Sequence, residues 1–247
     1  MDSLTSSLLL GVAAGSANVL GGLMVVARRD PWDPRILHGF VALGAGFMLA
    51  AALLRMGPEA AELTRAAPLL ILAGYLLVHL FEHTIAPHFH FGEETHPHLV
   101  VGSSIWASAL MGLVVHSLFD GISIASGFLV SPALGLLVFA AIILHKAPEG
   151  FAIASVMVAA GVRRGGALAS TLAVGLASVA GVLAAQALAG YVGAALALST
   201  GVTLYVAASD LIPEVNKEEG AMMALLVFAG VALFYGSELC LLALGLS

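Results

Sequence analysis

Two segments near the middle of the chain place ionisable residues inside apolar stretches that are long enough to cross a membrane. One begins at His116 and has Asp120 four residues later, and the other begins at His145 and has Glu149 four residues later. A glycine follows each carboxylate. Four residues are about one helical turn, so each histidine shares a helix face with its carboxylate. Imidazole and carboxylate together form a ligand set for divalent metals such as zinc or iron.

The link between these two stretches is short, around residues 129–132, which predicts that the two helices are antiparallel neighbours. Antiparallel packing can bring both pairs to one depth, giving up to four nitrogen and oxygen ligands from two helices. Such a set suits zinc, iron, manganese, cobalt or nickel, and the ligands alone select none of them. Ionisable side chains at membrane depth are costly, so a doubled motif favours a functional role over helix packing.

Two more residues of the second segment bear on this site. Pro148 removes a backbone hydrogen bond one residue before Glu149, which predicts a kinked helix lining a polar cavity. Lys146 lies three residues before Glu149, on the same face, and can pair with Glu149 or with Asp120. Its positive charge opposes a second bound cation. We therefore expect one metal ion, with Lys146 in the space of a second.

The composition is that of a polytopic membrane protein. The chain is 60% hydrophobic and 10% charged, with a mean hydropathy of +1.05, whereas soluble domains are about a quarter charged. Eight mostly apolar stretches reach the length of about 20 residues that a span needs. They cover approximately residues 4–27, 36–56, 66–86, 99–128, 133–160, 166–188, 191–214 and 221–245. We expect Gly57 and Pro58 to end the second span, and we place the sixth break near Gly190.

An internal repeat relates spans 1–3 to spans 6–8 at an offset of 155 to 160 residues. Residues 46–59 and 201–214 share glycine, leucine and alanine positions and a final Pro-Glu. Five crossings separate equivalent helices, so the two copies run in opposite directions, as in many transporters with a midplane site. The predicted fold is one all-α membrane domain over residues 1–247. Its eight transmembrane helices form a 3+2+3 arrangement around the central pair of spans 4 and 5.

Basic residues predict the orientation in the membrane. Six lie in odd-numbered loops and two flank the second loop: Arg28, Arg29, Arg35, Arg163, Arg164 and Lys217 against Arg55 and Arg65. This bias favours odd loops in the cytoplasm and both termini outside it. Short loops and the lack of a targeting signal favour a prokaryotic inner membrane. The expected partners are divalent metal ions and lipid; a homodimer is left open, and no basic patch indicates nucleic acid.

The third loop, over residues 87–98, is rich in histidine and is predicted to face the cytoplasm. In and just before it stand five histidines: His83, His88, His90, His96 and His98. Tracts of this kind bind metals weakly, and we expect an exit-side metal contact without fixed geometry. Asp210 and Glu214 lie one turn apart in the seventh span and can form a further entrance or exit site for cations.

The segments that begin at His116 and His145 resemble the signature sequences of the fourth and fifth helices of the ZIP (Zrt-, Irt-like protein) family. The resemblance implies eight spans, external termini, a 3+2+3 inverted repeat and transport of zinc, iron or manganese into the cytoplasm. It implies metal-binding roles for His116, Asp120, His145 and Glu149, and a metal contact at Met48. Members that bind two metals carry a carboxylate or another ligand where Lys146 stands. Ser117 and Ser178 fall near that second site, and we expect them to be packing serines.

The predicted function is therefore transport of divalent transition metals, with zinc first and iron, manganese and cadmium next, by alternating access. No catalytic cofactor is expected, because the metal is the cargo. One alternative is an intramembrane metal-dependent enzyme, but the His-Glu-x-x-His pattern of such enzymes is absent. Others are a passive channel and a metal-sensing receptor, and the sequence does not separate a transporter from a receptor that uses the same fold.

Overall fold

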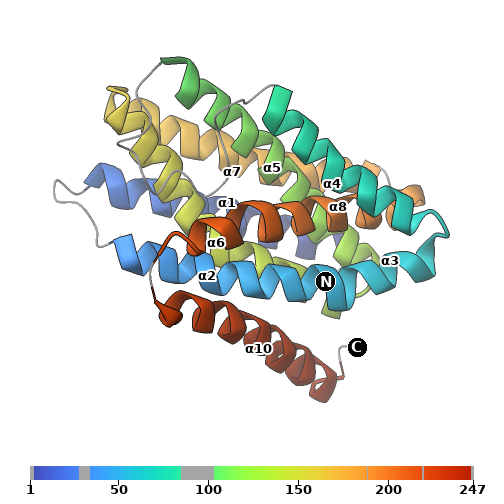
Figure 1. Ribbon diagram of the computed structural model, residues 1–247. Helices are drawn as coiled ribbons and strands as arrows, with labels where there is room; N and C mark the ends of the chain where they lie inside the picture. The colour runs from blue at the N-terminus through green and yellow to red at the C-terminus, as the bar shows by residue number, and fades with distance from the viewer. Residues whose placement is uncertain (1–2, 28–33, 85–102, 188, 219, 246–247) are drawn as a thin grey trace.

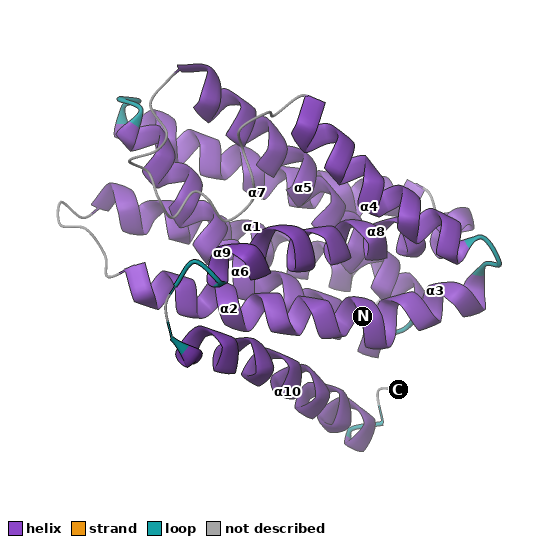
Figure 2. Ribbon diagram, viewed as in Figure 1, coloured by secondary structure: helices purple, strands orange, loops and turns teal. Residues whose placement is uncertain are grey.

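The computed structural model describes residues 3–27, 34–84, 103–187, 189–218 and 220–245, and in this part of the chain it contains helices and short turns without strands (Figure 2). The elements are α1 (Ser3–Ala27), α2 (Pro34–Ala50), η1 (Ala51–Met56), α3 (Gly57–Leu63), α4 (Ala67–Thr84), α5 (Ser103–Val130), α6 (Pro132–Ala159), α7 (Arg164–Ala187), η4 (Ala189–Tyr191), α8 (Val192–Tyr205), η5 (Val206–Leu211), α9 (Ile212–Val215) and α10 (Ala221–Ala243). The helices α5 and α6, which meet at Ser131, contain the paired motifs.

Eight helical stretches of the described chain are long and apolar enough to span a membrane, as the sequence predicts. Their bounds agree with the predicted spans to within a few residues at most ends. Among the described residues the sixth span ends at Ala187 and the seventh begins at Ala189, close to the predicted division near Gly190. The prediction of an all-α membrane protein with eight spans is confirmed.

The predicted end of the second span is wrong. Gly57 and Pro58 do not stop the helix, which continues through α3 to Leu63. The turn before them, η1, is a π-helix in which the Gly57 N–H donates to the carbonyl of Ala52, five residues back. A π turn shifts the backbone register by one residue, so the chain accommodates a proline that lacks the N–H of a regular helix.

The seventh span has the same device at the equivalent place. Its π-helix, η5, precedes Pro213, and the Ile212 N–H donates to the carbonyl of Ala207, again five residues back. The two π-helices cover residues 51–56 and 206–211 and are therefore offset by 155 residues, as is the predicted repeat. Two π-helices at equivalent positions are less expected by chance than two similar apolar sequences, so they support the internal repeat.

The helices associate in matching sets. The elements α1, α5, α6 and α7 form a four-helix bundle, in which α1 packs closely on α6 and α7 packs equally closely on α5. The element α2 pairs with α10, and α4 pairs with α8, on the flanks of that bundle. In Figure 1, α10 lies alongside α2 at one edge of the molecule. Exchanging each of spans 1–3 with its counterpart in spans 6–8, and α5 with α6, preserves these contacts.

Close glycine contacts between helices also occur in pairs that the internal repeat relates. A Cβ on Gly46 of α2 would overlap the carbonyl of Val227 in α10, and a Cβ on Gly201 of α8 would overlap the carbonyl of Ile71 in α4. Gly15 of α1 packs against the α7 glycine that the repeat predicts as its own counterpart. Small residues allow helix backbones to approach in this way inside membranes.

Candidate metal centre

A tight turn sets the two motif helices side by side. Ser131 is the N-cap of α6, and its hydroxyl accepts a hydrogen bond from the Leu134 N–H. Pro132 occupies the first turn of α6, where its missing N–H costs nothing. Because α6 begins directly after α5 ends at Val130, the chain reverses and the motifs return to a common depth.

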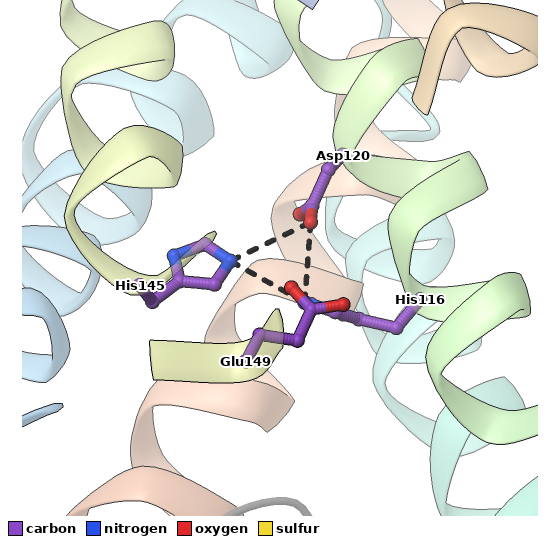
Figure 3. Close-up of side chains that lie close together, drawn as sticks. All are labelled: His116, Asp120, His145 and Glu149. Carbon is purple, nitrogen blue, oxygen red and sulfur yellow. Dashed lines mark hydrogen bonds and ion pairs between the residues drawn. The ribbon is translucent and has the colours of Figure 1, made fainter. Parts of the chain in front are cut away.

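Three ligand atoms from the two helices face one another (Figure 3). His116 Nε2 lies 3.2 Å from Asp120 Oδ2 and 3.4 Å from His145 Nε2, and His145 Nε2 lies 3.5 Å from Asp120 Oδ2. In a tetrahedral site with zinc–ligand bonds of about 2.0–2.1 Å, neighbouring ligand atoms are about 3.3 Å apart. The three atoms therefore already have the spacing of one face of a zinc tetrahedron.

The orientation of the His145 ring suits metal binding. Its Nδ1 lies 3.1 Å from the carbonyl oxygen of Ala141, one turn earlier in α6. A carbonyl only accepts, so Nδ1 carries the proton and the neutral ring has its lone pair on Nε2. Fixing the tautomer through the second ring nitrogen is the usual arrangement for histidines that bind metals.

The fourth candidate ligand, Glu149, is bound by two neighbouring side chains. Ser117 donates to its Oε1 at 2.9 Å, and Lys146 donates to its Oε2 at 2.6 Å. The Lys146 ammonium also lies 2.7 Å from Asp120 Oδ2 and donates to Ser117 Oγ at 2.5 Å. An ammonium has three donors, and here each of them has an acceptor. Lys146 thus links both carboxylates of the site, where the sequence left the choice between them open.

The charged side chains of this site are buried, which raises the free-energy cost of leaving any of them without a partner. The four ligand side chains belong to residues that are 2 to 8% exposed, and Lys146 is fully buried. With both carboxylates ionised, the lysine charged and the imidazoles neutral, the site has a net charge of −1. This negative net charge attracts a cation, in a setting where a charge without a partner is costly. The donor set and its charge both fit a metal such as zinc.

Two features of the site were missed in the sequence. Ser117 was expected only to pack helices, but its hydroxyl bridges Lys146 and Glu149. The signal was present, because Ser117 follows His116 as Lys146 follows His145 in the doubled motif. The glycines after the carboxylates also had no assigned role. They admit neighbouring helices, since a Cβ there would overlap backbone carbonyls of α1 and α7.

Met48, where the family resemblance implies a metal contact, lies in α2, which packs against α6. It is fully buried in α2, in an apolar cluster that includes Ala141. Gly44, one turn before Met48, packs against the Cβ of His145. A metal contact at Met48 stays a prediction.

The peripheral residues divide by location. Asp210 is buried in η5, and the backbone of Glu214 lies in α9. His83 is exposed in the last turn of α4, where its Nδ1 lies 2.8 Å from the carbonyl oxygen of His79. The other predicted histidines of the third loop, His88, His90, His96 and His98, lie outside the described residues. The described part of the chain contains one group of three or more potential metal ligands, the paired motifs.

A second buried polar contact was not predicted. The Tyr205 hydroxyl donates to Glu82 Oε2 at 2.8 Å, and Tyr75 Oη lies 2.6 Å from Ser209 Oγ. These contacts join α4 to α8 and η5. Glu82 corresponds to Glu238 across the internal repeat, and the sequence alone predicts no partner for it.

Comparison with known proteins agrees with this geometry. Residues 93–238, more than half of the chain, match the family described as ZIP zinc transporter. Zinc transporter ZIP9 of Micropogonias undulatus is 31% identical over 160 residues, covering 59% of this chain and 50% of that protein. Zinc transporter ZIP9 of Xenopus tropicalis is 30% identical over 196 residues, covering 72% of this chain and 63% of that protein. The chain thus spans between half and two thirds of the length of these relatives.

Proposed function

This chain belongs to the ZIP zinc transporter family, and on that premise we propose that it carries divalent transition-metal cations, zinc foremost, across a membrane. The family is one of transporters and not of enzymes. The observation that carries the proposal is the buried group of His116, Asp120, His145 and Glu149, whose ligand atoms lie within 4.8 Å of one another. A cation that has left water at membrane depth needs ligands of this kind in place of its hydration shell.

The proposed path runs through the four-helix bundle, with the site between α5 and α6 opening alternately to the two sides of the membrane. The matched helix contacts, the glycine contacts and the paired π-helices support an inverted 3+2+3 repeat, the architecture in which such sites lie near the midplane. We propose import into the cytoplasm with both termini on the opposite side, because basic residues gather in the odd-numbered loops. A prokaryotic inner membrane and a homodimer stay predictions.

Uptake into sealed vesicles tests this function. Purified protein in liposomes loaded with a zinc-sensitive dye should give saturable uptake, and iron, manganese and cadmium should compete in a panel of added ions. Saturation distinguishes a carrier from an open channel. Zinc binding without any uptake would instead favour a receptor that uses the same fold, and peptide cleavage by the purified protein would favour an enzyme.

Acid should weaken metal uptake. A protonated imidazole has no lone pair on Nε2, so a proton at His116 or His145 competes directly with the cation. Zinc affinity should therefore fall as the pH is lowered from neutral into the acid range. Zinc binding at equilibrium, measured over this range with ionic strength held constant, checks the direction. An affinity that stayed level or rose in acid would contradict imidazole ligation.

The bound stoichiometry should be one metal ion per chain in this site. Lys146 contributes a buried positive charge beside both carboxylates, and this charge opposes the binding of a second cation whichever acceptors the ammonium uses. Replacing the ammonium with a carboxylate, in Lys146→Asp, should raise the number of bound zinc ions from one to two. Elemental analysis after equilibrium dialysis measures this number, and Lys217→Asp, which changes the other lysine, is the matched control. Two adjacent zinc ions in the unaltered protein would refute the role of Lys146.

A further inference from the structure

Among the buried polar side chains of the four-helix bundle that have no hydrogen-bond partner in the described residues, two lie next to the glycines that follow the paired motifs' carboxylates. They are Asn18 of α1, through both Oδ1 and Nδ2, and Ser178 of α7, through Oγ. Both residues are fully buried. An unpaired polar group in an apolar interior costs free energy, and helices in lipid normally satisfy such groups internally. Both side chains therefore have the capacity to accept a donor that reaches them in another state of the protein.

Asn18 is aimed at the interior of the bundle. On α1, Gly15 packs on α7 and Gly21 packs on the Ala147 carbonyl of α6. At 100° per residue, Asn18 lies midway between these two directions, about 60° from each. The backbone of Asn18 also rests directly on Gly150, the residue after the ligand Glu149. Its side chain thus points between α6 and α7 beside the metal centre.

Ser178 has the equivalent position on the other side. On α7, Gly175 packs on α1 and Gly181 packs on the Leu118 carbonyl of α5, with Ser178 midway between them. The backbone of Ser178 rests on Gly121, the residue after the ligand Asp120. An offset of 160 residues relates Ser178 to Asn18, as it relates the glycines around them. Both unpartnered groups therefore face the interior of the bundle, each beside the residue that follows one of the two carboxylates.

A metal bound to Asp120 and Glu149 would compete with the Lys146 ammonium for the same oxygens. Its Nζ lies 2.7 Å from Asp120 Oδ2, the same oxygen that completes the triangle with the two imidazoles, and 2.6 Å from Glu149 Oε2. A divalent cation bound to these oxygens would stand only a few ångströms from the ammonium, where like charges repel strongly in a poorly polarisable interior. The ammonium would also lose two of its three acceptors, and a buried charge without acceptors is costly.

We propose that Asn18 and Ser178 form a second seat for the Lys146 ammonium, which it occupies when the metal takes Asp120 and Glu149. Lys146 lies one turn before Gly150, on the α6 face that packs against Asn18, so a rotation of its long side chain moves Nζ toward α1 and α7. Asn18 Oδ1 and Ser178 Oγ then accept in place of the two carboxylates. This inference rests on the proposed function and makes Asn18 and Ser178 positioning residues for Lys146.

NMR signals of lysine can report the movement of the Lys146 ammonium, because Lys146 and Lys217 are the only lysines of the chain. Protein labelled with carbon-13 at lysine Cε and held in nanodiscs should give two signals, and Lys217→Arg identifies the remaining one as Lys146. Zinc should shift the Lys146 signal. Asn18→Leu should alter the chemical shift of Lys146 in the zinc-bound protein and leave it unchanged in the zinc-free protein. If Asn18 acted only in helix packing, the substitution would alter the Lys146 shift in both the zinc-bound and the zinc-free protein.

A double-mutant cycle separates this seat from a general effect on folding. Asn18→Leu should lower zinc affinity by about tenfold to a hundredfold, the effect of losing one hydrogen bond to a charged group. In a Lys146→Met background the same substitution should change zinc affinity less than about twofold, because no ammonium remains to be seated. Asn18→Asp, which keeps an acceptor, should retain the zinc-dependent shift of Lys146.

The outcomes distinguish failure of the second lysine seat from failure of the proposed transport function. If zinc binds the parent protein but the Lys146 signal does not move, or if Asn18→Leu weakens binding equally with and without Lys146, the second seat is refuted and the proposed function stands. If the parent protein binds no zinc or related cation at all, the proposed function fails and the seat fails with it.

Discussion

Replacing either His145 or Glu149 with alanine should reduce metal uptake to the level of protein-free vesicles. Each substitution removes one of four buried ligands, and the remaining three do not replace the hydration shell of a dication. Even an outer partner of a metal ligand is worth about 10–100-fold in affinity, so loss of a ligand should lower uptake by at least about 100-fold. Time-resolved zinc uptake into proteoliposomes, normalised to the amount of inserted protein, measures this loss.

Matched controls come from exposed positions of the same residue types. His79→Ala removes an imidazole from the exposed surface of α4, and Glu62→Ala removes a carboxylate from α3. Both variants should retain most of the uptake. Because Glu149 also accepts from Lys146 and Ser117, the Glu149→Ala protein should be checked for insertion and folding by its thermal transition. Normal uptake in both His145→Ala and Glu149→Ala would refute transport through this site.

Gly150→Ala should destabilise the protein even though it adds only one methyl group. The new Cβ would overlap the backbone of Asn18, and neither backbone can retreat without separating α6 from α1. Overpacking of this kind costs about 1–3 kcal/mol. The thermal midpoint in detergent should fall, and uptake should fall with it, because Gly150 is next to Glu149 and any separation of α6 from α1 displaces that ligand.

Gly165 provides the control for this prediction. It lies in the first turn of α7, and a Cβ there would meet nothing within 4 Å. Gly165→Ala should therefore leave the thermal midpoint unchanged or raise it, since alanine favours a helix over glycine by up to about 1 kcal/mol. Equal midpoints for Gly150→Ala and Gly165→Ala would show that the α1–α6 contact does not require glycine.

Much of this protein follows from local sequence. A membrane span must satisfy its own backbone hydrogen bonds, so an apolar stretch of sufficient length is a helix whatever surrounds it, and the eight spans were predictable for that reason. The four-residue spacing in each motif places His116 with Asp120 and His145 with Glu149 through helix periodicity alone. The short link at Pro132 then leaves little choice but an antiparallel pair.

Other features depended on contacts between segments that are far apart in the chain. Whether Lys146 pairs with Asp120, with Glu149 or with both was open in the sequence, because a long side chain takes its partners from whichever helices surround it. The second span continues as a helix past Pro58 because a π turn precedes it, and no residue pattern predicts that turn. The role proposed for Asn18 rests on the packing of α1 on α6 and α7, which the sequence does not reveal.

The division has one physical cause. Backbone hydrogen bonding and side-chain periodicity act within a few residues, so the amino-acid sequence by itself determined the spans, the paired ligand types and their shared helix faces. Distances between helices are decided by how closely backbones approach, which depends on where glycines from distant segments meet. Only the tertiary structure could therefore bring the ligand atoms to the spacing of a metal tetrahedron and set a lysine between both carboxylates.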